Sequence, residues 1–190
     1  MDILKECAVK FCALLDKSYF IIAGHKGKKI EIDLRFQEDH FFHLVGLHKL
    51  SDLKDFYANR NKRNILHCIL SGEMTYSDIQ KSVYFDEIKR RLDFFVMIEE
   101  ILDSNDIVLK FNQNICRSRI KAKYIIYIKR QQTYIHMFIN RAEASGTYFL
   151  SSFFPRDDEM YLQRQAKYKV LYKRKNNNIT NTKKVLVDRL

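Results

Sequence analysis

The feature that most constrains this 190-residue chain is a change in hydrophobic periodicity near residue 105, which coincides with a change in charge. Before that point apolar residues recur mainly at helical spacing. After it, segments rich in branched and aromatic residues alternate with period two. Residues 1–109 carry 16 Lys and Arg against 18 Asp and Glu, a net charge of −2, whereas residues 110–190 carry 18 against 5, a net charge of +13. The chain therefore divides into a mainly helical half and a basic β half.

The first half predicts several helices around one β-hairpin. Residues 2–16 have the spacing of an amphipathic helix, and two alternating segments then flank a turn at Gly24–Gly27. Ser51 and Thr75 are expected helix caps, and Gly46 is expected to bend or end a helix. The expected strands are 18–24 and 28–36, and the further helices are 39–50, 61–70 and, as the longest, 83–103.

The second half predicts an antiparallel sheet because its strand-like segments are joined by short polar turns. Residues 174–184 are expected to be a mobile loop by composition, and residues 185–190 a last strand or a partner-binding tail. The expected strands are 107–111, 121–130, 133–141, 147–154 and 166–173. We expect an α+β fold in which N-terminal helices, with a short β-hairpin, precede a curved antiparallel sheet.

The length suits a single domain over residues 1–190, made of a helical half (1–105) and a basic sheet half (106–190). The four cysteines show neither C-x-x-C pairing nor metal-ligand spacing, which suits a reducing compartment. Lys5, Glu6 and Lys10 interrupt the N-terminal apolar stretch, so it does not resemble a signal peptide. No run approaches the roughly 20 apolar residues that span a bilayer. We expect a cytoplasmic protein that does not bind membranes.

Candidate chemistry is densest at residues 38–50, which read EDHFFHLVGLHKL and place His40, His43, His48 and Lys49 close together. Histidine is the side chain that changes charge near neutral pH. His40 and His43 lie one helical turn apart, but the zinc-protease pattern H-E-x-x-H is absent, as are G-x-S-x-G and a glycine-rich phosphate loop. We therefore expect no metal and no cofactor.

Metal-free phosphodiester cleavage fits these residues better. Attack by the 2′-hydroxyl of RNA needs a base, an acid, and cations around the phosphorane. His43 and Lys49 can supply these groups from the helical half, together with Arg91 of the long helix. The basic half adds phosphate-binding candidates with tyrosines between them, as in single-strand RNA platforms. These candidates are Arg117, Arg119, Lys121 and Lys123, followed by Tyr148, Ser151 and Ser152 at the end of a central strand.

Each candidate also has an ordinary structural interpretation. His43 is flanked by apolar residues and suits a core position, whereas Lys49 and Arg91 suit solvated helix surfaces. Ser151 and Ser152 suit a strand edge, and tyrosines in strands more often pack across the sheet than stack on bases. We interpret the remaining histidines as structural, namely His25, His67 and His136.

Three segments, FFHLVGLHKL, YFDEIKRRLDFF and TYFLSSFFP, together resemble the fourth class of phage-associated nuclease domains. These domains are named for the barnase–EndoU–colicin–RelE superfamily (PBECR). The resemblance covers residues 36 to 173, and its matching positions are Phe42, His43, Leu44, Gly46, Leu47, Lys49, Arg91, Tyr148, Ser152, Phe153 and Phe154. It implies a metal-independent ribonuclease encoded on mobile elements, with helices followed by a four- or five-stranded antiparallel sheet.

The favoured hypothesis is a metal-independent endoribonuclease, a toxin or phage-related effector that cleaves tRNA or mRNA. His43 ranks first as the acid or base, above His40, and His48 ranks below both. The predicted catalytic residues are His43, Lys49, Arg91, Tyr148 and Ser152; the predicted substrate-binding residues are His40, His48, Arg117, Arg119, Lys121, Lys123 and Ser151. The alternatives are a non-catalytic nucleic-acid-binding module, or an interaction protein whose basic face docks an acidic antitoxin or immunity protein.

Overall fold

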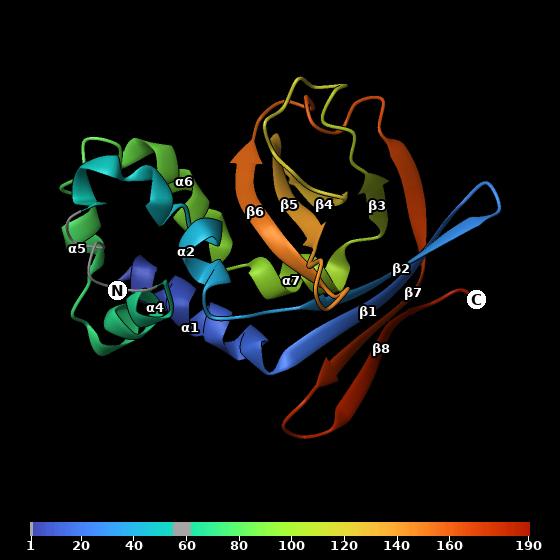
Figure 1. Cartoon of the computed structure of the whole chain (residues 1–190), viewed down its shortest axis with the longest axis horizontal. Coiled ribbons are helices and arrows are strands. Elements are labelled where there is room, and N and C mark those ends of the chain that lie inside the picture. Colours follow the sequence, from blue (N-terminus) through green and yellow to red (C-terminus); the bar gives the residue numbers. More distant parts are fainter. Residues whose placement is uncertain (1, 55–61) are drawn as a thin grey trace.

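The computed structural model describes residues 2–54 and 62–190, and places the helices on one side of the molecule and most of the sheet on the other (Figure 1). The helices are α1 (Ile3–Leu15), α2 (His40–Leu44), α4 (Lys62–Ser71), α5 (Tyr76–Ile79), α6 (Asp86–Phe95) and α7 (Ile98–Ser104), with short 3₁₀ turns η1 (Leu47–Lys49) and η2 (Ser51–Leu53). The strands are β1 (Lys17–His25), β2 (Lys28–Arg35), β3 (Ile107–Lys110), β4 (Tyr124–Arg130), β5 (Thr133–Arg141), β6 (Tyr148–Arg156), β7 (Ala166–Asn177) and β8 (Thr182–Asp188).

The eight strands form one sheet in the order β1-β2-β6-β5-β4-β3-β7-β8. Because β1 also pairs with β7, the first seven strands form a closed ring of neighbours. All pairings are antiparallel except that of β2 with β6, a single parallel bridge between Leu34 and Tyr148. The expected α+β fold is confirmed. The sheet of the described residues is mixed and has eight strands rather than the four or five antiparallel strands expected, because the N-terminal hairpin β1–β2 and strand β8 also belong to it.

The two halves share one large hydrophobic core. Asp2 caps the N-terminus of helix α1, since its side chain accepts a hydrogen bond from the Lys5 backbone N–H, and the helix buries Phe11 on its inner face. On the sheet side the same core includes Met137 of β5 and Phe153 of β6. Residues of the opposite sheet face form a second, smaller cluster: Leu109, Phe111, Ile125, Tyr134, Phe138 and Leu162. Period-two alternation in the basic half therefore supplies two apolar faces, one of which packs against the helices.

Three local predictions need correction. The single helix expected over 83–103 is two helices, because Met97 leaves helical geometry at ψ 8° between α6 and α7. The loop expected over 174–184 is a β-hairpin, in which the Asn177 side chain accepts hydrogen bonds from two turn N–H groups. Ser51 does not cap a helix through its side chain, since it begins η2. The Thr75 cap is confirmed, as a capping box with Asp78.

A buried ammonium group joins the end of α7 to the sheet. Lys173 of β7 is 0% exposed, and its Nζ donates to the carbonyl oxygens of Leu102 (2.9 Å), Asp103 (3.2 Å) and Asn105. The last carbonyls of a helix lack intrahelical partners and carry partial negative charge, so a cation here satisfies them. Burial lowers the pKa of Lys173 to about 8, against the opposing charges of Asp103 and Asp106. The group is therefore mostly protonated at neutral pH.

We predict that Lys173→Met lowers the free energy of unfolding by at least about 2 kcal/mol, because several buried carbonyls lose their donor. Release of the buried charge offsets part of this loss. The control is Lys169→Met, an exposed position on the same strand. Urea unfolding should show a lower midpoint with an unchanged slope for Lys173→Met alone. Equal midpoints for the two variants would contradict the role assigned to Lys173.

Candidate active site

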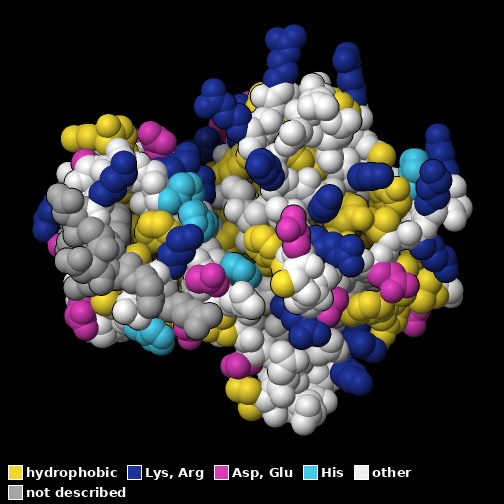
Figure 2. All heavy atoms as spheres, viewed as in Figure 1, with side chains coloured by type: hydrophobic (Ala, Val, Ile, Leu, Met, Phe, Trp, Pro, Cys, Tyr) yellow, Lys and Arg dark blue, Asp and Glu magenta, His cyan; other side chains and the backbone are white. Residues whose placement is uncertain are grey.

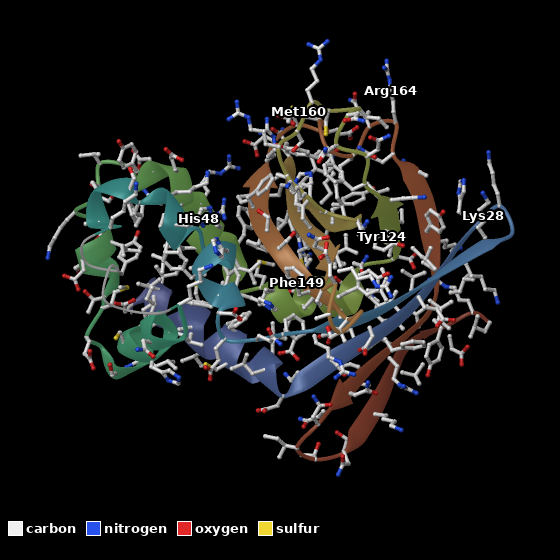
Figure 3. All side chains as sticks on the ribbon, in the orientation of Figure 1. Lys28, His48, Tyr124, Phe149, Met160 and Arg164 are labelled. Atoms are coloured by element: carbon white, nitrogen blue, oxygen red, sulfur yellow. The ribbon has the colours of Figure 1, made fainter. Side chains whose placement is uncertain are left out.

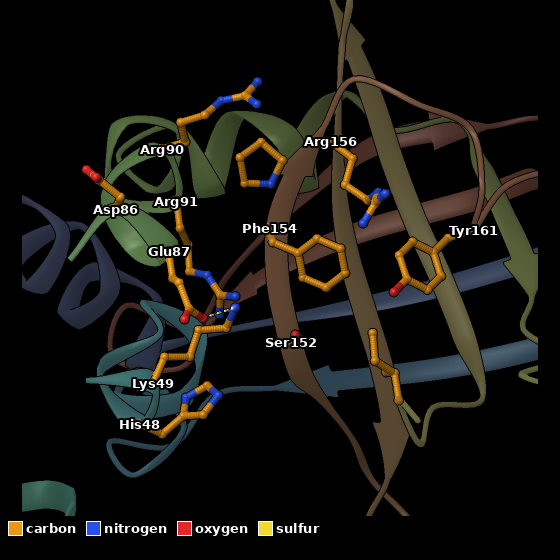
Figure 4. A pocket seen from close by; sticks show the side chains of 12 residues that line it. His48, Lys49, Asp86, Glu87, Arg90, Arg91, Ser152, Phe154, Arg156 and Tyr161 are labelled. Atoms are coloured by element: carbon orange, nitrogen blue, oxygen red, sulfur yellow. Dashed lines mark hydrogen bonds and ion pairs between the residues drawn. The ribbon is translucent and has the colours of Figure 1, made fainter. Parts of the chain in front are cut away.

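The two halves meet at a cleft of about 470 Å³ between the η1–α6 region and β6 (Figure 4). Figure 2 shows histidine side chains gathered at this junction, and Figure 3 shows His48 on the side of the helices that faces β6. The helical half contributes His48, Lys49, Asp86, Glu87, Arg90 and Arg91 to the lining, and the second half contributes Ile120, Ser152, Phe154, Pro155, Arg156 and Tyr161.

A glycine allows the histidine-bearing turn to approach α6. Gly46 follows α2 with φ +90°, a conformation that favours glycine. A Cβ atom at this position would lie 2.8 Å from Cγ2 of Ile88 and 3.1 Å from both Cδ and Nε of Arg91. The turn therefore packs directly on the Arg91 side chain, and it places His48 and Lys49 beside that guanidinium.

Arg91 is a buried cation with unused hydrogen-bonding capacity. It is 4% exposed, and its Nη1 donates to the carbonyl oxygens of His43 (3.2 Å) and Leu44 (3.4 Å). Its Nε has no partner in the described part of the chain. Burial lowers the pKa of Arg91 to about 10, which leaves it charged at neutral pH. A buried charge with a free N–H is costly unless an anion completes its shell.

The other cations of the cleft already have carboxylate partners. Lys49 Nζ lies 3.4 Å from Oε2 of Glu87, and Arg156 pairs with Asp158 at 2.5 Å. Arg90 donates to both carboxylate oxygens of Asp157, at 2.9 and 2.7 Å, which ties α6 to the end of β6. Among residues 2–54 and 62–190, Arg91 is the cleft cation that forms no ion pair. Its positive charge is therefore not paired with a carboxylate among these residues.

His48 and His43 form a ring pair at the cleft wall, with centroids 4.9 Å apart. His48 lines the cleft, whereas His43 lies outside the cleft lining and also contacts the Phe42 ring. Burial, followed by the nearby His43, Arg91 and Lys49, lowers the pKa of His48 to about 4. Burial and the charge of Lys62 lower the pKa of His43 as well. Both imidazoles are therefore neutral at pH 7, the form that accepts a proton.

The cleft brings together four residues that the sequence singled out, His48, Lys49, Arg91 and Ser152. His40 and Tyr148 line a separate hollow of about 320 Å³, where the His40 ring stacks on Phe149 at 5.0 Å. Figure 3 labels Phe149 on β6. Ser151 occupies the bulge between β5 and β6, and its hydroxyl donates to the Phe138 carbonyl at 3.3 Å.

The predicted basic residues of the second half lie outside the cleft. Lys121 and Lys123 line a third hollow, of about 560 Å³. Arg117 and Arg119 are exposed on the segment between β3 and β4, and Arg117 has φ +48°. In the described chain these four side chains make no hydrogen bond or ion pair, so they remain available to a polyanion.

Sequence reasoning overlooked Phe154, Arg156, Tyr161 and Arg90 as cleft residues. Period-two spacing from Ser152 places Phe154 and then Arg156 on the same face of β6, and could have identified both. Tyr161 lies in an irregular segment, where no periodicity gives its direction. Arg90 neighbours Arg91 on a helix, and only the packing of α6 on β6 distinguishes their roles.

The α+β fold, with a basic sheet beside a histidine-bearing turn, is consistent with a BECR-like nuclease fold. A family model described as phage-Barnase-EndoU-ColicinE5/D-RelE like nuclease4 (PBECR4) matches residues 3–190. The chain belongs to this nuclease family, which confirms the resemblance seen in the sequence. No curated protein and no solved structure matches the chain.

In the part of the chain that the structure describes, no helix is both long enough and apolar enough to cross a membrane. Over the same residues, no three His, Cys, Asp or Glu side chains are arranged to hold a metal ion.

We predict that Gly46→Ala destabilises the protein more than Gly72→Ala, by about 1–3 kcal/mol, because the added methyl group collides with Ile88 and Arg91. Gly72 is the matched control: it has φ +86°, follows α4, and would place its Cβ in open space. Both variants incur the cost of left-handed backbone, and only the first incurs the overlap. Chemical unfolding of the two variants measures the difference. Equal losses would show that the close approach of the turn to α6 contributes little.

Proposed function

We propose that this nuclease is an endoribonuclease that cleaves RNA by attack of a 2′-hydroxyl on the adjacent phosphate, without a divalent metal. The observation that carries the proposal is that Arg91, a buried cation with no ion pair among the described residues, lines the same cleft as the His48 imidazole. The positive charge of Arg91, which lines the cleft, stabilises the phosphate. The Ser152 hydroxyl, on the opposite wall, donates a hydrogen bond to a non-bridging oxygen of the same phosphate.

His48 acts as the general base in this proposal. It removes the proton from the 2′-hydroxyl, whose oxygen attacks phosphorus while the bond from phosphorus to the 5′-oxygen breaks. The Lys49 ammonium group protonates the leaving 5′-oxygen. The products are a 2′,3′-cyclic phosphate and a 5′-hydroxyl. His43, ranked first from sequence, contacts the His48 ring, and Tyr148 lies outside this reaction centre.

We predict that the purified protein cleaves labelled tRNA or mRNA in the presence of EDTA. His48→Asn should lower kcat/KM by about 100-fold or more, the usual contribution of a general base. Arg91→Gln should lower it by about 100- to 1,000-fold, as for loss of a transition-state donor. The control is His67→Asn, at an exposed position away from the cleft. Electrophoresis of end-labelled RNA measures the rate and identifies the termini.

The outcomes separate the competing hypotheses. Cleavage that survives His48→Asn but is lost in His43→Asn would return the base to the histidine ranked first from sequence. Intact RNA under saturating binding would favour a non-catalytic nucleic-acid-binding module. Cleavage that EDTA abolishes and divalent metal restores would overturn the metal-free mechanism.

We predict that kcat/KM rises with pH through about pH 4 and then stays level to neutral pH, because His48 must be unprotonated to act as a base. His43→Asn removes the positive charge that protonated His43 places beside His48. The pKa of His48 should therefore rise, and the increase in kcat/KM should move to higher pH. A pH–rate profile, together with NMR titration of the His48 ring, checks both expectations. A limb near the ordinary histidine pKa of 6.5 in the wild type would contradict the assignment.

The same proposal includes a role as a toxin or phage-related effector, restrained by an acidic antitoxin or immunity protein. The support is the net charge of +13 in residues 110–190, together with the exposed Arg117, Arg119, Lys121 and Lys123. Induced expression should slow cell growth, and His48→Asn should abolish the effect. Toxicity that survives this substitution would point to binding rather than cleavage.

A further inference from the structure

The cleft contains an aromatic wall that the proposed chemistry does not use. Phe154 and Tyr161 are half-buried and line the cleft beside Ser152, with ring centroids 5.6 Å apart and an interplanar angle of 67° (Figure 4). The Phe154 ring also lies nearly parallel to the buried Phe138, at 5.3 Å and 25°. The wall is therefore fixed from below by core packing and open toward the cleft.

A guanidinium group lies over each ring of this wall. The Arg91 guanidinium carbon lies 5.8 Å from the Phe154 centroid, and that of Arg156 lies 5.5 Å from the Tyr161 centroid. Ile120 adds an apolar side chain to the same cleft. Aromatic rings beside a cation suit a nucleotide-binding site. The base of a nucleotide is planar and can stack on a ring, while its phosphate is anionic and is attracted by the cation.

We propose that Phe154 and Tyr161 form a stacking subsite for one unpaired nucleobase of the nucleotide whose phosphate Arg91 binds. This inference rests on the proposed nuclease function and specifies its substrate as single-stranded. In a duplex each base is stacked between its neighbours, so the base reaches the rings only after it has been unstacked. The cleft volume of about 470 Å³ lies within the range of about 300–1,000 Å³ typical of small-ligand sites.

The neighbouring basic segment extends this subsite along the strand. Ile120 belongs to the same segment as Arg117 and Arg119, whose exposed side chains have no partner among the described residues. An RNA strand with one base stacked on the aromatic wall can place the phosphates of its next nucleotides at these arginines. Stacking then sets the register of the substrate, and the arginines add affinity that falls with salt.

The experiment measures binding, not cleavage, with 2′-O-methyl RNA oligonucleotides of about eight nucleotides, because they lack the attacking hydroxyl. Each position in turn is replaced by an abasic nucleotide, and fluorescence anisotropy gives the dissociation constant. One position should weaken wild-type binding about 5- to 150-fold, the contribution of a single base–aromatic stack. A hairpin-closed duplex of the same sequence should bind more weakly than the single strand.

Phe154→Leu should weaken binding of the intact oligonucleotide and remove the effect of the abasic position. The matched control is Phe20→Leu, a half-buried phenylalanine with the Arg174 guanidinium 5.7 Å from its centroid, on a surface remote from the cleft. That variant should bind as the wild type does. The abasic series on the wild type needs no substitution, so the test stands even if Phe154→Leu folds poorly.

The outcomes distinguish this inference from the function on which it rests. If the dissociation constant is the same at every abasic position, or if duplex and single strand bind equally, the stacking subsite is overturned even when RNA is cleaved. A position-dependent series without cleavage of unmodified RNA supports the subsite and overturns the nuclease mechanism. An absence of binding to every oligonucleotide overturns both.

Discussion

The arrangement of this protein depends on a cluster of charges that joins the end of α7 to the sheet. Lys173 satisfies the terminal carbonyls of α7 from inside the molecule, while Lys175 pairs with Asp103 and Lys17 with Glu99 at the edge of the same contact. A helix end buried without donors would be unstable. Because α7 is fixed in this way to β1 and β7, α6 is held against β6, and the cleft follows from that contact.

The cleft shows how stability and function can oppose each other in one residue. Arg91 holds the turn after α2 through two carbonyls, yet its Nε is left without a partner among the described residues. A fold selected for stability alone would complete or remove such a charge. Desolvation and nearby positive charges also lower the pKa values of His43 and His48. The electrostatics of the cleft are therefore arranged for an anionic ligand.

Much of the fold could be predicted from the residues because local patterns determine it. The apolar stripe of α1, the Thr75 capping box and the alternation of β4 and β5 are each visible in a few consecutive positions. The break at Met97 and the hairpin at residues 174–184 were missed. The first lies in a continuous helical pattern, and the second in asparagines that suit a loop and a turn equally well.

The sequence by itself determined the order of elements, the basic character of the second half and the nuclease family, because these follow from periodicity, charge and motif. Only the tertiary structure decided which candidates meet. His48 rather than His43 lines the cleft, Tyr148 lies with His40 elsewhere, and Phe154 and Tyr161 complete the wall. The side chains that enter the cleft depend on the orientation of the turn that packs on Arg91 at Gly46. They also depend on which face of β6 each residue occupies after the bulge at Ser151. Such contacts join residues far apart in the chain, and no local pattern encodes them.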